Sequence, residues 1–206
     1  MDLSSLRADI TFYLHRSDLT DAQVDGFIAR AMERVGQSLL AVESEALAVS
    51  SWDFSGKWAL PDDYRSARNI IHVTSGTELK PLSMLEAQKW SGGGSPSLGY
   101  RIADGGIRVY PANTEIYALE YFAKPALLFS SISTNWVTDS YQNLALYGSL
   151  VEAARWERDS ESLAMFEQMF TDALITAQQQ ADRARYGAAP VASSHYQAPG
   201  AITRSK

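Results

Sequence analysis

Cysteine is absent from this sequence of 206 residues, and so are long hydrophobic runs. Without cysteine the chain forms no disulfides and offers no thiolate to a metal ion. No apolar run approaches the ~20 residues that a membrane-spanning helix requires. The opening residues also lack the basic region and the apolar core of a signal peptide. We therefore expect a protein without a membrane segment that is made and used in a cytoplasm.

Basic residues are scarce at the two ends of the chain that show helical patterns, so the net charge of −6 is unevenly spread. Residues 1–45 and residues 138–186 each hold 8 acidic and 4 basic residues, whereas residues 46–137 hold 8 of each. Residues 187–206 hold 2 bases and no acid. Solvated helix faces commonly carry such charge. Alternatively, an acidic surface faces a polyanion such as nucleic acid that it must not bind.

Recognisable catalytic and metal-binding patterns are also missing. His15, His72 and His195 have no second histidine or carboxylate at the spacing of metal ligands. The pair Asp62-Asp63 follows a proline and reads as an ordinary turn rather than a catalytic carboxylate pair. The glycine-rich Ser91–Gly94 lacks the Gly-Lys-Ser/Thr ending of a phosphate-binding loop. We expect no enzymatic activity, no cofactor and no metal site.

Helical patterns dominate both ends of the chain. Leu3–His15 places apolar residues on one helix face, and Thr20 with Gln23 forms a capping box that starts a second helix. The stretch Thr138–Tyr186 contains no proline and a single glycine, Gly148. It predicts two long helices that begin near Asp139 and near Ser160, with a joint at Arg158–Ser160.

The middle of the chain shows the patterns of β-structure. Alternating Trp52, Phe54 and Trp58 have the period of a strand, and Asp104-Gly105-Gly106 predicts a tight hairpin. The remaining predicted elements are a turn at Leu60–Tyr64, strands at Arg68–Thr74, Tyr100–Ala103, Ile107–Tyr110 and Thr114–Lys124, a short helix at Leu82–Trp90, and a loop at Ser91–Gly99. Because Thr114–Lys124 is partly apolar on both faces, we expect a central strand or one that packs on a neighbouring subunit.

The order of these elements predicts an α+β fold with four parts. Residues 1–45 form a helical hairpin, residues 46–137 an inserted small antiparallel sheet or barrel, and residues 138–186 a helical pair that packs with the hairpin. Residues 187–206 are rich in Ala, Ser, Gly and Pro and form an extended tail that does not fold alone.

The aromatic residues of the middle part allow two interpretations. Such residues most often fill a small barrel or an interface. They could also form a face on which a sugar or a base stacks, which would make the protein a carbohydrate- or protein-binding module. The residues concerned are Trp52, Trp58, Trp90, Tyr100 and Tyr110.

Several segments together resemble one protein family. The opening YLHRSDLTDAQVDGFIARAMERV joins two helices, and the middle contains WALPDDYRSARNI, GYRI…GGIRVYP and LEYFAKPALL. The end contains NLALYGSLVEAARWERD before the last helix. In this order, over roughly residues 1–185, the chain resembles the head-to-tail adaptor (connector, or tail-tubular) proteins of short-tailed bacteriophages. These motifs are patterns of aromatic and turn residues, not catalytic signatures.

The resemblance implies a structural protein of the virion neck. Such a protein forms a ring of twelve copies that docks on the portal protein, extends the DNA channel and attaches tail components; DNA passes through without specific binding. We expect the acidic helical parts to line the channel. The basic tail would bind the portal through apolar and polar anchors, which are Val191, His195, Tyr196, Ile202 and Arg204.

Overall fold

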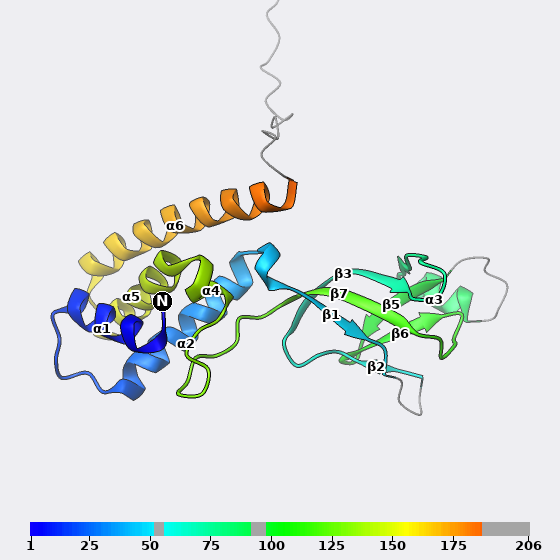
Figure 1. Ribbon diagram of the computed structural model, residues 1–206, viewed down its shortest axis with the longest axis horizontal. Helices are drawn as coiled ribbons and strands as arrows, with labels where there is room; N and C mark the ends of the chain where they lie inside the picture. The colour runs from blue at the N-terminus through cyan, green and yellow to red at the C-terminus, as the bar shows by residue number, and fades with distance from the viewer. Residues whose placement is uncertain (52–55, 92–97, 187–206) are drawn as a thin grey trace, which may run out of the picture.

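The computed structural model describes residues 1–51, 56–91 and 98–186 of the chain. Two parts lie side by side along its longest axis, one helical and one built mainly of strands (Figure 1). The helical part contains α1 (Leu3–Leu14), α2 (Asp21–Ser38), α4 (Trp136–Ser140), α5 (Gln142–Glu157) and α6 (Ser160–Tyr186). The chain enters the strand part through the short 3-10 helix η1 (Val42–Ser44) and later returns to the helices. The predicted α+β class is confirmed.

Helix α5 is the centre of the helical part. Ten of its residues, from Leu144 to Ala154, are buried, and six of these share one hydrophobic core with residues of α1, α2 and α6. Gly148 is a point of close packing between helices, because a Cβ atom there would lie 3.2 Å from both Ala31 of α2 and Phe170 of α6. Because Gly148 has no side chain, α2, α5 and α6 can approach one another closely.

The helix boundaries follow from local capping. Thr20 accepts a hydrogen bond from the Gln23 N–H and Gln23 reaches back to the Thr20 N–H, so the predicted capping box is confirmed. Arg158 adopts a left-handed conformation (φ 59°) that ends α5, which confirms the predicted joint. The predicted helix start near Asp139 is wrong: Asn135 caps a separate helix α4 that ends at Ser140, and the long helix α5 begins at Gln142.

The strand part consists of two sheets. The first is three-stranded and antiparallel, in the order β1 (Glu45–Val49), β7 (Tyr117–Ala123) and β3 (Tyr64–His72). The second has the order β2 (Trp58–Ala59), β6 (Gly106–Tyr110), β5 (Gly99–Ala103) and β4 (Lys80–Pro81). A second hydrophobic core between them contains Trp58, Tyr100 and Ile107 from one sheet and Tyr117 and Leu119 from the other. Helix α3 (Met84–Trp90) lies next to β5.

Most of the predicted strands are present, with differences in extent and grouping. The β5–β6 hairpin turns at Asp104 (φ 53°) and Gly105 (φ 69°), as the Asp-Gly pair predicts. Strand β7 is central, but it belongs to a different sheet from the hairpin. β3 begins earlier than predicted, at Tyr64, and the β4–β5 pair is parallel. Trp52 and Phe54 lie outside the described residues, and Trp58 belongs to a strand of only two residues.

The helical and strand parts meet where α2 ends. A Cβ atom on Gly36 would lie 2.7 Å from Cδ of Pro125, on the segment that leads from β7 back to the helices. The Arg65 guanidinium donates to the carbonyls of Gln37 and Leu39 and so binds the end of α2 to β3. The chain division proposed from the sequence, at residues 45, 137 and 186, stays a prediction.

Candidate assembly surfaces

The carboxylate pair Asp62-Asp63 has a structural role in the turn before β3. Asp63 accepts a hydrogen bond from the Tyr121 hydroxyl at 2.9 Å, and its carbonyl accepts the Lys124 N–H at 2.7 Å. Burial, together with the hydrogen bond to Asp63, raises the pKa of Tyr121 to about 12. Asp62 is exposed on the same turn. The turn at Leu60–Tyr64 therefore anchors β7 and does not assemble a catalytic pair.

The histidines do not converge on one site. His72 lies at the end of β3, where Nε2 is 2.9 Å from Glu115 and Nδ1 is 2.6 Å from Ser75. His15 follows α1 in the helical part, with φ 51°. His195 lies outside the described residues. Across residues 1–51, 56–91 and 98–186, no group of three His, Asp or Glu side chains could hold a metal ion.

The aromatic residues of the middle part belong mostly to the core. Trp58 and Tyr100 are buried between the two sheets, so their rings present no face to a ligand. Trp90 and Tyr110 are half-buried, and Trp52 is outside the described residues. In the glycine-rich loop, residues 92–97 are likewise outside the described part. This arrangement favours core packing over the stacking face of a carbohydrate-binding module.

Five arginine and glutamate side chains connect three helices of the helical part. Glu167 of α6 lies 2.7 Å from Arg34 of α2 and 2.8 Å from Arg155 of α5. Arg155 also lies 2.8 Å from Glu152, whose other oxygen is 3.5 Å from Arg30. The hydrogen bond from Arg34 lowers the pKa of Glu167, and the charges of Arg34 and Arg155 add to this effect. Most arginines of the helical part are thus occupied by partners within the subunit.

The remaining surface of the helical part is acidic. Within α2, α4 and α6, five carboxylates are exposed and form no ion pair with any described residue. They belong to α2, α4 and α6 and are Glu33, Asp139, Glu161, Asp172 and Asp182. This surface repels polyanions, because its negative charge is not neutralised within the subunit.

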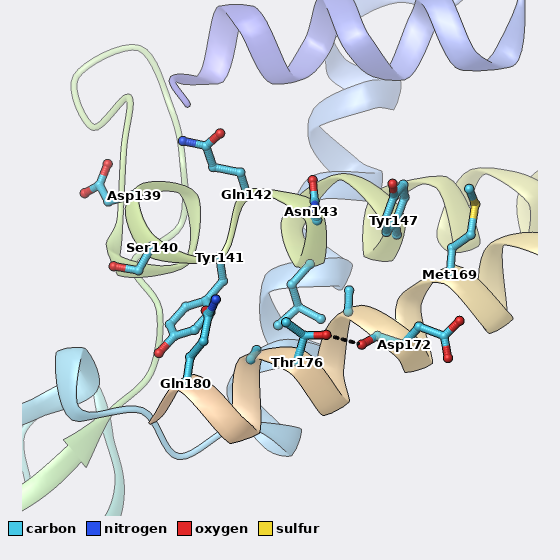
Figure 2. A pocket seen from close by; sticks show the side chains of 13 residues that line it. Asp139, Ser140, Tyr141, Gln142, Asn143, Tyr147, Met169, Asp172, Thr176 and Gln180 are labelled. Atoms are coloured by element: carbon cyan, nitrogen blue, oxygen red, sulfur yellow. Dashed lines mark hydrogen bonds between the residues drawn. The ribbon is translucent and has the colours of Figure 1, made fainter. Parts of the chain in front are cut away.

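Two of these carboxylates line an open groove between α4, α5 and α6 (Figure 2). The groove has a volume of about 550 Å³, and no lysine or arginine lines it. Tyr141 and Gln180 lie at one end and Met169 at the other, while Asp139 lies on α4 and Asp172 on α6. Its two carboxylates and its lack of a basic residue make it unsuitable for a phosphate group.

The outward face of the three-stranded sheet is apolar, a feature that the sequence analysis missed. Leu47, Val49, Val73 and Ile116 are between 52% and 65% exposed. They lie on one face, because Val49 is paired with Ala118 and Ala118 with Ile71, and side chains two residues apart share a face. The signal was the alternation in Glu45–Val49, where alanines point inward and larger residues outward. Contiguous exposed apolar surface of this kind marks an interaction site.

A further exposed aromatic group lies at the end of α1. Phe12 is 73% exposed and lies 6.2 Å, between ring centroids, from both Tyr13 and His15. All five residues proposed from the sequence as portal anchors, from Val191 to Arg204, lie outside the described part of the chain. No helix among the described residues is long and apolar enough to cross a membrane.

Comparison with known protein families identifies a matching family model. The family model described as SU10 adaptor protein matches residues 1–194, which is most of the chain. No curated protein matches it. The match spans both the helical part and the strand part, so it applies to the whole described fold.

Proposed function

The chain belongs to the SU10 adaptor protein family, a family of phage head-tail adaptors, and we propose that it forms the ring that docks on the portal of a short-tailed phage. As a member of this family it is a structural phage protein. In the proposed role the ring contains twelve copies, extends the DNA channel below the portal and provides the platform on which tail proteins attach. Its place is then the neck of the virion, after assembly in the host cytoplasm.

The observation that carries this proposal beyond the family is the distribution of charge. Residues 1–45 and 138–186 hold all of the net negative charge, while residues 46–137 are neutral. The arginines of the helical part largely pair within the subunit, and exposed carboxylates such as Asp172 and Asp182 form no ion pair with a described residue. A wall of such surfaces repels phosphate, so DNA slides past without binding.

The ring is therefore oriented, in this proposal, with its helical parts toward the channel. The neutral strand parts then face neighbouring subunits or the tail. A cryo-electron microscopy map of the assembled collar tests the orientation directly. Strand parts around the channel with the helices outside would contradict it.

The segment that binds the portal is, in this proposal, residues 187–206. It carries two bases and no acid, and its anchors are Val191, His195, Tyr196, Ile202 and Arg204. A segment that orders on binding loses conformational entropy but covers a large surface. Because twelve segments act in one ring, weak contacts add up through avidity.

The decisive experiment mixes the purified chain with the portal protein of its phage and images the mixture by electron microscopy. We expect a twelve-fold collar below the portal. The chain without portal, imaged at the same concentration, shows whether the ring forms before docking. A chain that stays separate from the portal under all conditions would refute the docking role. The binding-module alternative gains no support, because Trp58 and Tyr100 are buried.

A further inference from the structure

Among the described residues, those that cover the outward face of the three-stranded sheet lie at the end where the last helix arrives. Glu45 of β1 is paired with Phe122 of β7, so both lie on this face. Arg185, in the last turn of α6, lies above the Phe122 ring at 5.4 Å and 3.8 Å from the Glu45 carboxylate. Phe122 is accordingly only 8% exposed.

Beyond this end the same face is uncovered. The next pairs along the strands are Leu47 with Glu120 and Val49 with Ala118. Past them, the Val73 N–H donates to the Ile116 carbonyl at 3.0 Å. The four large apolar side chains of these rows are all more than half exposed. The other face of the sheet, with Tyr117, Leu119 and Tyr121, packs in the core.

The chain leaves the described part at the covered end of this face. Arg185 is fixed there, because it also donates to the Leu40 carbonyl at 3.2 Å, and twenty residues follow Tyr186. Ile116, at the far end of the uncovered rows, is six residues from the covered Phe122, which is about 20 Å along an extended strand. Twenty extended residues reach about 66 Å, so the segment is long enough to cover them.

We propose that residues 187–206 pack on the outward face of the three-stranded sheet of their own chain. The segment supplies apolar side chains, including Val191, Tyr196 and Ile202, for the row of Leu47, Val49, Val73 and Ile116. Its charge also fits, because it has bases but no acid, while Glu120 in the middle of the face forms no ion pair with a described residue. The α6 contact already brings the start of the segment to the face.

This packing is independent of the proposed ring. A consequence for docking does depend on the proposed function: if the same segment binds the portal, the portal must displace it from the sheet. The segment would then be held back until docking, which limits unwanted contacts of its apolar anchors in the free subunit.

The test uses disulfide trapping in the full chain, which has no native cysteine. One variant carries Val49→Cys and Ala192→Cys. The control carries Ile175→Cys and Ala192→Cys. Ile175 is 49% exposed on α6, and eleven residues of helix separate it from Tyr186, about 16 Å. The tether therefore reaches both positions, but only Val49 lies on the sheet face.

We expect the Val49 pair to form its disulfide at least tenfold faster than the control pair, as followed by mass spectrometry. Equal rates in the two variants would overturn the proposal, because a freely moving segment reaches both positions. A mixture of the two single variants, Val49→Cys and Ala192→Cys, shows whether the segment comes from the same chain or from a second copy. If that mixture forms linked dimers as fast as the double variant closes, a neighbour covers the face and the proposal is wrong.

A second measurement changes the face itself. Adding Leu47→Ser and Val73→Ser to the Val49 pair removes apolar side chains from exposed positions, so thermal unfolding should change little. The rate of disulfide formation should fall several-fold toward that of the control. An unchanged rate would show that the apolar face does not hold the segment.

Discussion

At the scale of single residues, Glu167 shows how the subunit uses its charges. It lies on α6 and accepts hydrogen bonds from Arg34 of α2 and Arg155 of α5. The side chains are half-buried, so solvent screens the interaction and its contribution is modest. The two ion pairs of Glu167 nevertheless link the last helix to α2 and α5.

The lowered pKa of Glu167 predicts a pH-dependent stability. Its carboxyl has an ordinary value of 4.5 in the unfolded chain and a lower value in the folded chain. The stabilisation is therefore complete above about pH 4.5 and is lost as the pH falls through the folded value. We expect Glu167→Gln to lower the free energy of unfolding by about 1 kcal/mol at pH 7, with the difference shrinking below pH 4.5.

Urea unfolding at pH 7 and at lower pH measures this difference. Asp182→Asn is the matched control, because Asp182 is exposed on the same helix and forms no ion pair with a described residue. Its stability should equal that of the unchanged chain at both pH values. A Glu167→Gln effect that stayed constant from pH 7 to pH 3 would contradict the assignment.

Two glycines of α2 should respond to alanine in opposite directions. At Gly26 the nearest atom to an added Cβ is Nη1 of Arg30, at 3.7 Å, whereas at Gly36 it is Cδ of Pro125, at 2.7 Å. Gly26→Ala should stabilise the chain by about 0.5–1 kcal/mol through helix propensity. Gly36→Ala should destabilise it by about 1–3 kcal/mol, because the rigid proline ring must move. Urea unfolding measures the free energy of unfolding of both variants. Changes of the same sign would contradict the close contact between Gly36 and Pro125.

At the scale of elements, helix α4 is the connection that brings the chain back from the sheets. Asn135 is buried; its side-chain oxygen accepts the N–H groups of Val137 and Thr138, both at 3.0 Å. Its amide nitrogen donates to the Ala126 carbonyl at 2.7 Å. One side chain therefore caps the helix and also ties down the segment that follows β7.

Replacement of this cap should be costly. Asn135→Ala removes the cap and also the hydrogen bond to the partly buried Ala126 carbonyl, so we expect a loss of about 2–3 kcal/mol. Thr20→Ala, at the exposed cap of α2, provides the comparison and should cost about 1 kcal/mol. Thermal unfolding of the two variants measures the ranking. Equal losses would show that the bond to Ala126 contributes little.

At the scale of the whole molecule, the helical part, the strand part and the last twenty residues differ in net charge. The helical part is acidic, the strand part is neutral, and the last twenty residues are basic. In the proposed ring these three regions face DNA, neighbouring or tail subunits, and the portal respectively. The separation assigns each surface a different kind of partner.

Removal of residues 187–206 tests the last of these assignments. Both hydrophobic cores are built from residues before 187, so the shortened chain should still fold. Its unfolding temperature should be slightly lower than that of the full chain, because the sheet face loses its proposed apolar cover. It should no longer dock on the portal in a sedimentation or electron microscopy assay. A chain whose last twenty residues are replaced by a Gly/Ser segment of equal length should behave like the shortened chain. Unchanged portal affinity in either variant would refute the role of this segment.

The sequence alone determined the local structure of the two helical ends. Local structure depends on interactions within a few residues, so the local sequence is enough to predict it. Examples are the spacing of apolar residues, the capping box at Thr20 and the joint at Arg158. The Asp-Gly hairpin was predictable for the same reason. The sequence also determined the separation of charge and the resemblance to phage adaptors, which the family match supports.

Only the tertiary structure decided which distant segments meet. The alternation of side chains predicts a strand but does not show which other strand it pairs with. The sequence therefore could not show that β7 belongs to one sheet and the β5–β6 hairpin to another. The same holds for the bond between Asp63 and Tyr121 and for the contacts of Glu167. Whether Leu47 and Val49 are buried depends on what covers the sheet. The sequence showed their alternation, but only the fold placed the end of α6 over Glu45 and Phe122 and left Leu47 and Val49 exposed.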